Sequence, residues 1–327
     1  MASTPHNDPP ICGVILAAGE GSRIRPISDA RPKAALPVGN RALILHHLDA
    51  LAAVGIREAI IVVGASGDSI RRIVTADPVS AVVSVRYVEQ AERRGIAHAV
   101  SCAAPHTPSD FVLLLADVYM PDHDLARALR QFRASGCDGV LGAKRESDPA
   151  LMARNFSIEM DGDRVRHVVE KPCPPMSGLK GVGTYVFSRA IFDAIGRTPV
   201  SSLRGEQEIT DAVQVLIDSG ADVRAVEVTR DDINVNDAHA LLHANLAHLN
   251  QIGATTLIAP NATVHPDASL RQTVVGTAAR IGPGVHLDEC LLLEGVSVTT
   301  PGRFSRTIFA PDCAVHVEMV SQGRAEP

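Results

Sequence analysis

Apolar and polar segments alternate regularly through the first 150 residues. Short apolar runs with the length of β-strands occupy residues 11–16, 58–64, 83–90, 110–120 and 137–145. Segments with helical periodicity lie between and after them, at residues 42–55, 68–76, 96–105 and 123–136, the second of them opening on Asp68 as its expected cap. This alternation predicts an α/β fold, a doubly wound parallel or mixed sheet with helices on both faces. In such sheets, ligands bind at the carboxyl ends of the strands.

The pattern changes after residue 250. Aliphatic residues then recur six positions apart, at Ile258, Val264, Leu270, Ile281, Leu287 and Leu293. This spacing predicts a short left-handed parallel β-helix, and the break between 270 and 281 limits it to a few coils. A helix over 239–253 would lead into it. We therefore expect a disordered leader at 1–10, a first domain at 11–250 and a β-helix domain at 251–327.

Composition narrows the function classes. The 327 residues are 46% hydrophobic, carry a net charge of −6 and include only 3% aromatic residues and no Trp. Neither a clustered basic face nor an aromatic stacking platform is visible, which argues against a nucleic-acid partner. Six scattered cysteines without metal spacing indicate free thiols in a reducing compartment. No signal segment or bilayer-length apolar run is present, so we expect a soluble cytoplasmic protein without membrane contact.

A basic loop follows the first predicted strand. Gly19 and Gly21 open it, and four cations crowd behind them, at Arg23, Arg25, Arg31 and Lys33. Glycine lets backbone N–H groups face a ligand, and like charges repel unless an anion holds them. A solvated basic loop is the alternative. The arrangement favours a phosphate chain, which Arg23 would clamp and Lys33 would meet as a point charge.

Asp117 ends the apolar run "VLLLAD". A carboxylate at a strand end either caps the next turn or binds a metal. With a phosphate site beside it, Mg²⁺ is the better interpretation, because Mg²⁺ combines one or two carboxylates with phosphate oxygens.

One fifteen-residue stretch carries a family resemblance. "GEGSRIRPISDARPK", from Gly19 to Lys33, matches G-x-G-[TS]-R-x-x-P-x-[TS]-x-x-x-P-K, the signature of the sugar-1-phosphate nucleotidylyltransferases. From Ile11 onward the whole chain resembles that family, including its C-terminal hexapeptide repeats. Further counterparts are "QAERRGIAHAV" (90–100), "LADVYM" (115–120), "VVEKP" (168–172), "GVGTYVF" (181–187) and "GEQEITDAV" (205–213).

The resemblance implies a reaction. A sugar-1-phosphate oxygen attacks the α-phosphate of a nucleoside triphosphate in line, without a covalent intermediate, and pyrophosphate leaves. Arg23 would stabilise the departing pyrophosphate, and Lys33 would orient the triphosphate.

The same resemblance implies the binding residues. Gln90 would read the base, and its spacing from Gly95 favours UTP or dTTP. Glu170 would bind a sugar hydroxyl and Lys171 the sugar phosphate, with Gly183 nearby. The full set of expected nucleotide contacts is Leu16, Ala17, Ala18, Gly19, Gly21, Ser22, Gln90 and Gly95.

The expected metal is Mg²⁺, bound by Asp117 and one residue of the late segment 231–245. Counting back from "LLHAN" favours Asn234, comparison with the uridylyltransferase pattern favours Asn236, and Asp232 is a third alternative. These residues also suit the cap of the helix that follows.

Departures from the family pattern gather on the sugar side. Ala116 replaces a glycine, Ile96 a threonine, and Phe156 or Ser157 a further glycine. Gly181 stands where N-acetylglucosamine enzymes place asparagine. The resemblance therefore leaves an atypical sugar or a cyclitol phosphate open as the acceptor.

The expected function is transfer of a nucleoside monophosphate to a sugar-1-phosphate by a homo-oligomer assembled through the β-helix. Three alternatives remain: a guanylyltransferase that uses GTP, a catalytically silent regulatory subunit, and a bifunctional enzyme whose β-helix transfers an acyl group with His265 or His286.

Overall fold

The computed structural model describes residues 11–19, 21–29, 31–65, 67–174, 177–201 and 205–318. The expected leader at 1–10 lies outside them. Two compact units make up the chain: Met1–Glu20 with Ile44–Asp232, and Gly21–Leu43 with Ile233–Pro327. The boundary expected at residue 250 stays a prediction, because compactness alone does not define folding domains.

A nine-stranded mixed sheet forms the centre of the first unit. Its main path runs β10-β9-β11-β6-β1-β4-β5, while β8 pairs with β11 and β12. Strands β1, β4, β5 and β6 are parallel, whereas β11 runs antiparallel to β6, β8 and β9. The strands are β1 (Cys12–Ala17), β4 (Glu58–Val63), β5 (Ser84–Glu89), β6 (Phe111–Leu115), β8 (Gly139–Glu146), β9 (Phe156–Asp161), β10 (Arg164–Glu170), β11 (Gly178–Phe187) and β12 (Val223–Glu227), with the short β7 (Val118–Tyr119) following β6.

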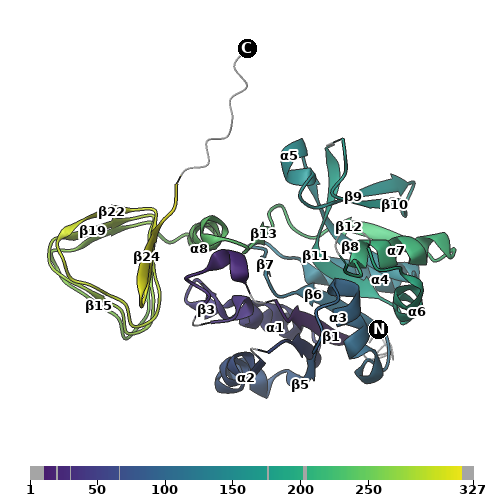
Figure 1. The fold of residues 1–327 in the computed structure, drawn as a ribbon, viewed down its shortest axis with the longest axis horizontal. Coiled ribbons are helices and arrows are strands. Elements are labelled where there is room, and N and C mark those ends of the chain that lie inside the picture. Colours follow the sequence, from purple (N-terminus) through teal and green to yellow (C-terminus); the bar gives the residue numbers. More distant parts are fainter. Residues whose placement is uncertain are drawn as a thin grey trace, which may run out of the picture. The chain divides into compact units, whose positions relative to one another are not determined.

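Helices cover both faces of this sheet, as the alternating pattern predicts (Figure 1). On one face, α3, α6 and α7 join strand residues in a single apolar cluster that includes Val14, Phe111 and Tyr185. On the other, Leu51 of α1 lies where a side chain on Gly13 would be. The helices are α1 (Leu43–Ala53), α2 (Gly67–Ala76), α3 (Ile96–Ala103), α4 (Leu125–Ser135), α5 (Pro149–Met152), α6 (Ala190–Arg197) and α7 (Ile209–Asp218), with 3₁₀ turns η3 (Pro78–Ala81) and η4 (Ala104–His106).

One cap prediction is wrong. Asp68 was expected to cap α2, but the helix already begins at Gly67. Asp68 therefore lies in the first turn, where a carboxylate still favours the positive end of the helix dipole. In the described residues, no helix combines the length and the apolar character needed to cross a membrane.

Stacked coils dominate the second unit and confirm the β-helix. The parallel sheets β14-β17-β20-β23, β15-β18-β21 and β16-β19-β22 form the sides of the triangle in Figure 1. Antiparallel β24 pairs with β23 and ends the stack. The strands are β14 (Thr256–Ile258), β15 (Thr263–Val264), β16 (Ser269–Arg271), β17 (Thr273–Val275), β18 (Arg280–Ile281), β19 (Val285–Asp288), β20 (Leu291–Leu292), β21 (Ser297–Val298), β22 (Gly302–Ser305), β23 (Thr307–Ala310) and β24 (Cys313–His316).

The apparent break in the hexad pattern is a regular feature. Stacked partners such as Arg271 and Asp288 lie 17 residues apart, so one corner of each coil is a residue shorter than three full hexads would require. Val264 and Leu270 stack on Ile281 and Leu287 as expected. Ile258 does not become buried. It is 42% exposed because its strand β14 is the edge strand of its sheet, with a neighbouring strand on one side only.

The second unit also contains segments from both ends of the sequence. Residues 21–43 belong to this unit, and the helix α8, which comes much later in the sequence, packs against β2. These elements are η1 (Ser22–Ile24), η2 (Lys33–Ala35), β2 (Pro37–Val38), β3 (Arg41–Ala42), β13 (Ile233–Asn234) and α8 (Ala238–Gln251). Asn245 of α8 accepts from the backbone N–H of Gly39 at 2.9 Å and donates to the carbonyl of Pro37 at 3.0 Å. These bonds join segments more than 200 residues apart.

Candidate functional site

The carboxyl ends of β1 and β6 place the first group of expected site residues. Leu16 pairs with Leu115, and the backbone N–H of Ala116 donates to the carbonyl of Leu16 at 3.1 Å. Asp117 follows in the turn after β6 and is partly exposed. The structure therefore brings the Leu16–Gly19 stretch and Asp117 to the same edge of the sheet, as expected for a ligand site there.

In the second unit, the signature loop is held by a left-handed glycine. Gly21 has φ of 72°, and its carbonyl accepts from the backbone of Ile24 and, at 2.8 Å, from the Ser28 hydroxyl. A side chain at Gly21 would also lie 3.3 Å from Cβ of Lys33. Glycine is thus required by the local geometry. Ser22 and Arg23, which follow it, are exposed.

Ion pairs account for part of the positive charge in the loop. Arg25 pairs with Asp29 at 3.2 Å, and Arg31 pairs with Glu294 of the same unit. Lys33 is only 9% exposed and donates to Oδ1 of Asn236. Arg23 makes no hydrogen bond or ion pair within the described part of the chain. The sequence argument counted four cations awaiting an anion. Arg23 and Arg25 are both exposed, but Arg25 is paired with Asp29, whereas Arg23 has no such partner among the described residues.

Gln90 follows β5 and is 7% exposed. Its Nε2 lies 3.2 Å from the carbonyl oxygen of Gly95 and 3.1 Å from Nδ1 of His98. Two partners fix the orientation of the amide, which a side chain that distinguishes bases requires. His98 is therefore a direct partner of Gln90.

Replacing Gln90 by alanine is expected to reduce discrimination between nucleotides about tenfold, measured as the ratio of kcat/KM for the preferred triphosphate to that for CTP. One hydrogen bond to a base edge is worth about 1 kcal/mol, which is close to that factor. Gln131→Ala, on α4, is the control. An unchanged ratio in the Gln90 variant would remove this residue as the base reader.

Gly95 has φ of 99° and lies against Gln207. A Cβ at Gly95 would come within 2.4 Å of the carbonyl oxygen of Gln207, whose backbone also bonds Arg94 and Ala97. The residue was expected to let a base approach the backbone. Its contact with Gln207 is a further reason for glycine.

We expect Gly95→Ala to destabilise the protein by about 3 kcal/mol or more, because the left-handed backbone and the clash with Gln207 both contribute. Gly55→Ala is the matched control, since Gly55 also has positive φ, 84°, but has open space around its Cβ position. It is expected to cost about 1–2 kcal/mol. Equal losses in chemical denaturation would show that the clash relaxes.

Buried His47 and partly buried His123 interact with each other, and His47 also interacts with Asp117. His47 is 4% exposed, and burial, His123 and His46 together lower its pKa to about 3 despite the opposing charge of Asp117. Burial lowers the pKa of His123 to about 4, although Asp124 and Asp122 act in the opposite direction. Nε2 of His123 lies 3.1 Å from the Thr184 hydroxyl. Both rings are therefore neutral at pH 7.

Stability should fall with acid because of these rings. Their folded pKa values lie below the usual 6.5, so the unfolded chain binds the protons first. Their contribution is complete above pH 6.5, and it is lost as pH falls toward 4 with a slope of about 1.4 kcal/mol per pH unit for each histidine. Denaturation of the wild type and of His123→Gln between pH 7 and 4.5 tests this, since the variant should show the smaller slope. Parallel curves would contradict it.

The expected sugar-side residues lie at the end of β10, where Glu170 and Lys171 are found, and in the middle of β11, which contains Gly183. Glu170 ends β10, and its Oε2 accepts from the Thr210 hydroxyl at 2.9 Å. Lys171 is exposed, with φ of 49°. Gly183 is buried, and a Cβ there would lie 2.9 Å from Leu115 and Val118. Close strand packing is thus a sufficient reason for glycine at 183.

The departures at Gly181 and Phe156 explain each other. A Cβ at Gly181 would fall inside the ring of Phe156, 1.7 Å from Cζ. Phe156 stacks on Tyr185 in the apolar cluster. The neighbouring Ser157 is 2% exposed, and its hydroxyl has no hydrogen-bond partner in the described structure.

The candidate ligands of the late segment differ in their surroundings. Asp232 is 8% exposed and forms ion pairs with Lys144 and Lys180. Oδ1 of Asn236 accepts a hydrogen bond from Lys33. Asp237, not either asparagine, caps α8, accepting from Ala240 at 2.8 Å. Asn234 lies four positions before the helix. Because Asp232 and Asn236 are already bound to lysines, Asn234 is the candidate that these contacts favour.

The donor set fits magnesium bound together with phosphates. Among the described residues, no group of three or more His, Cys, Asp or Glu side chains is placed to hold an ion. A cage built by the protein alone is therefore missing from this part of the chain. One carboxylate and one amide oxygen are the hard, sparse ligands that Mg²⁺ uses when substrate phosphates and water complete its shell.

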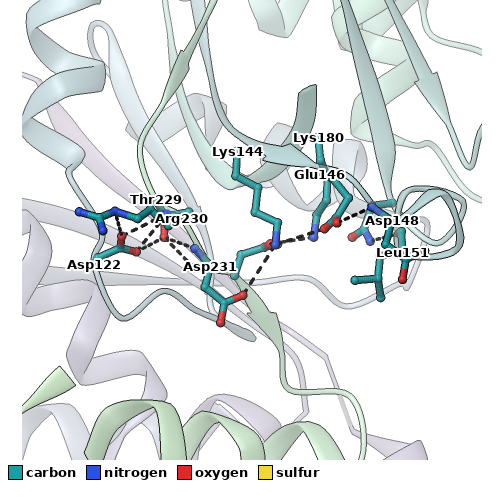
Figure 2. Close-up of polar contacts among 11 residues, drawn as sticks. Asp122, Lys144, Glu146, Asp148, Leu151, Lys180, Thr229, Arg230 and Asp231 are labelled. Atoms are coloured by element: carbon teal, nitrogen blue, oxygen red, sulfur yellow. Dashed lines mark hydrogen bonds and ion pairs between the residues drawn. The ribbon is translucent and has the colours of Figure 1, made fainter. Parts of the chain in front are cut away.

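Sequence reasoning missed a buried charged network in the first unit (Figure 2). Lys180 of β11 donates to Oδ1 of Asp232 at 2.7 Å, and Lys144 of β8 lies 3.2 Å from the same oxygen and 3.3 Å from Glu146. All four residues are less than 9% exposed. Nothing in "LGAKRE" or "GLKGV" marks these lysines as buried, because apolar and polar residues do not alternate in either segment.

Comparison with known proteins places the chain in a family. Residues 12–250 match the family model described as nucleotidyl transferase. The glucose-1-phosphate thymidylyltransferase of Streptomyces griseus is 33% identical over 311 residues, which cover 87% of this chain and 84% of that protein. The UTP–glucose-1-phosphate uridylyltransferase AglF of Haloferax volcanii is 31% identical over 215 residues, 66% of this chain and 87% of that one.

Solved structures agree on the fold. UDP-glucose pyrophosphorylase complexed with UDP-glucose superposes with a TM-score of 0.66 at 20% identity, covering 74% of this chain and 100% of that one. A putative glucose-1-phosphate thymidylyltransferase from Bacillus anthracis gives a TM-score of 0.64 at 26% identity, covering 73% and 95%. The matched family model spans most of the chain, and the chain therefore belongs to the nucleotidyl transferase family.

Proposed function

We propose that this protein transfers a nucleoside monophosphate from UTP or dTTP to a sugar-1-phosphate and releases pyrophosphate. The observation that carries the proposal is the signature loop, where Gly21 is fixed in the left-handed region and Arg23 is exposed and unpaired in the described structure. The relatives named for thymidylyl and uridylyl transfer to glucose-1-phosphate support both the reaction and the choice of base.

The reaction needs positioning and charge neutralisation. An oxygen of the sugar phosphate forms a bond to the α-phosphorus, and the bond from that phosphorus to the bridging oxygen of pyrophosphate breaks. The exposed guanidinium of Arg23 neutralises the charge that develops on the leaving group. Lys33 is held by Asn236 and presents a fixed ammonium to the triphosphate. The proton balance needs no general base, because the attacking phosphate oxygen is already ionised.

We propose Mg²⁺ as the cofactor, held by Asp117 and Asn234, with Asn236 and Asp232 as the weaker candidates. When bound, Mg²⁺ supplies charge neutralisation on the phosphate oxygens. Asp117 lies at the sheet edge where β1 ends at Ala17 and β6 ends at Leu115.

The binding roles follow the same assignment. Gln90 reads the base from a fixed amide, and Glu170 and Lys171 receive the sugar and its phosphate. Glucose-1-phosphate is the first acceptor to test, because the relatives carry it in their names. The Phe156 ring over Gly181 distinguishes this chain from the asparagine-containing pattern, so cyclitol phosphates belong in the same test.

Pyrophosphate release tests the proposal. ATP, CTP, GTP, UTP and dTTP are each combined with Mg²⁺ and with hexose, hexosamine and cyclitol 1-phosphates. Release with UTP or dTTP and one acceptor supports the proposal, and release with GTP alone would make the protein a guanylyltransferase. Neither release nor a thermal shift with any nucleotide would favour the regulatory alternative, and acetyl-CoA consumption would reveal an acyltransferase.

The assembly and compartment remain proposals. We propose a homo-oligomer formed through the β-helix, which sedimentation of the full chain would test. All six cysteines are free thiols, which agrees with the reducing cytoplasm proposed for the protein.

A further inference from the structure

The buried network around Asp232 has more charge than a fold requires. Two ammonium groups, Lys144 and Lys180, meet three carboxylates, those of Glu146, Asp231 and Asp232. Burial alone would lower the pKa of Lys144, but Asp232, Glu146 and Asp231 outweigh it and raise that pKa above its usual value. Lys144 is therefore charged, and the carboxylates beside it already neutralise that charge. The network is not a site for a further anion.

Stability does not explain the network. A buried ion pair costs several kcal/mol of desolvation per ion, and replacing it by well-packed apolar side chains is often neutral or stabilising. The lysines lie directly opposite each other on β8 and β11, at paired positions of the sheet where two apolar residues would pack without that cost. A charged network at such a place is best explained by what its geometry fixes.

What it fixes is the segment from Val228 to Asp232. The backbone N–H of Val228 donates to Ala143 at 3.0 Å, and Asp122 accepts from the backbone N–H of Arg230 and from the hydroxyl of Thr229. Figure 2 shows Asp122 at one end of this segment, with Lys144 reaching Asp231 at the other. Lys180 and Lys144 then hold Asp232 itself.

The anchored segment stops where the first compact unit stops, at Asp232. Asn234, the favoured second metal ligand, is the second residue beyond it. Only Ile233 separates Asp232 from Asn234, so fixing Asp232 limits the positions that the Asn234 backbone can take, because each residue adds only two soft backbone torsions.

We propose that Lys144 and Lys180 are positioning residues that act through Asp231 and Asp232 to hold the backbone carrying Asn234. This inference rests on the proposed function, since it concerns how the metal ligand is presented. Residues that orient a metal ligand typically change metal affinity by 10–100-fold when they are lost.

Three single variants test the inference. Lys180→Met and Lys144→Met remove an ammonium while keeping a long side chain. Arg145→Met is the matched control, because Arg145 neighbours Lys144 on β8 but is exposed and pairs with Glu227 at 3.1 Å. Two readouts do not depend on turnover: Mn²⁺ affinity measured by electron paramagnetic resonance with UTP present, and amide hydrogen exchange of peptides covering 233–236 in the ligand-free protein.

The expected result is about a tenfold loss of Mn²⁺ affinity and faster exchange at 233–236 in Lys180→Met, with a smaller change in the same direction in Lys144→Met and none in Arg145→Met. Wild-type Mn²⁺ affinity and exchange in a less stable Lys180→Met would overturn the inference, because the network would then be structural only. If Lys180→Met does not fold, Lys144→Met decides, since it leaves the Lys180–Asp232 pair intact.

A paired variant separates charge from position. Lys180→Met with Asp232→Leu removes both charges and should regain stability while Mn²⁺ affinity stays low. Recovery of both would overturn the inference. A wild type that binds no nucleotide would refute the proposed function, whereas the exchange at 233–236 would still decide whether the anchor holds that segment.

Discussion

Arg23→Ala is expected to lower kcat/KM by about 10³-fold, the lower end of what an arginine contributes to phosphoryl transfer. Arg25 and Arg31 have carboxylate partners, whereas Arg23 has none within the described residues and follows directly after the left-handed turn at Gly21. Arg23 is therefore the loop arginine that we propose for the ligand. Steady-state pyrophosphate release measures the effect, and thermal unfolding should remain unchanged because the side chain is exposed.

Arg25→Ala is the control for Arg23, because Arg25 lies two positions away and pairs with Asp29. It should retain activity within about threefold, since an exposed pair contributes little. Equal losses in the two variants would mean that the loop acts through its overall charge. A wild-type rate in Arg23→Ala would remove Arg23 from the mechanism.

Asp117→Asn should lower Mg²⁺-dependent turnover by about 10³-fold, because a carboxylate ligand to a catalytic metal supports several kcal/mol of charge stabilisation. The substitution keeps the shape of the side chain in the turn after β6, so the fold should persist. Turnover across a Mg²⁺ titration measures it, and excess Mg²⁺ should restore part of the rate.

Asp110→Asn is the control for Asp117, because Asp110 precedes the same strand at its opposite end. It should leave both the rate and the Mg²⁺ requirement unchanged. Near-normal turnover in Asp117→Asn would refute the metal role of this residue. Loss of the folded state in that variant would instead be seen in its circular dichroism and would direct the test to Asp117→Glu.

Local patterns carried most of the fold. The strand that ends at Ala17 and the one that ends at Leu115 are short apolar runs, and their carboxyl ends meet because parallel strands align their ends. The turn at Gly21 could also be predicted from the sequence, because a glycine followed closely by cations is a local pattern with a physical explanation. The 17-residue length of the β-helix coils was harder to predict. When only repeats of six residues are counted, the shortened corner of each coil looks like a break in the pattern.

Contacts distant in sequence could not be predicted. The sequence around Arg31 does not predict its contact with Glu294, and the sequence around Lys33 does not predict its contact with Asn236. In the sequence, Lys144 and Lys180 look like ordinary strand residues. Only the structure shows that they are paired across the sheet and that both contact Asp232. A buried lysine depends on a partner that only the tertiary structure supplies.

The bonds between the N-terminal loop and the C-terminal half have a consequence for how the protein is made. Lys33 bonds to Asn236, Asn40 bonds to the carbonyl of Val275 and Arg31 bonds to Glu294. The partners are separated by 203, 235 and 263 residues, so each bond can form only after the later partner has been synthesised. At about 5–20 residues per second, a ribosome needs roughly 10–50 s to deliver the last of these partners after the loop has emerged. The central sheet strands from β1 to β12 are synthesised before that moment. The signature loop is thus among the first parts of the chain to be translated and among the last to gain its full set of contacts.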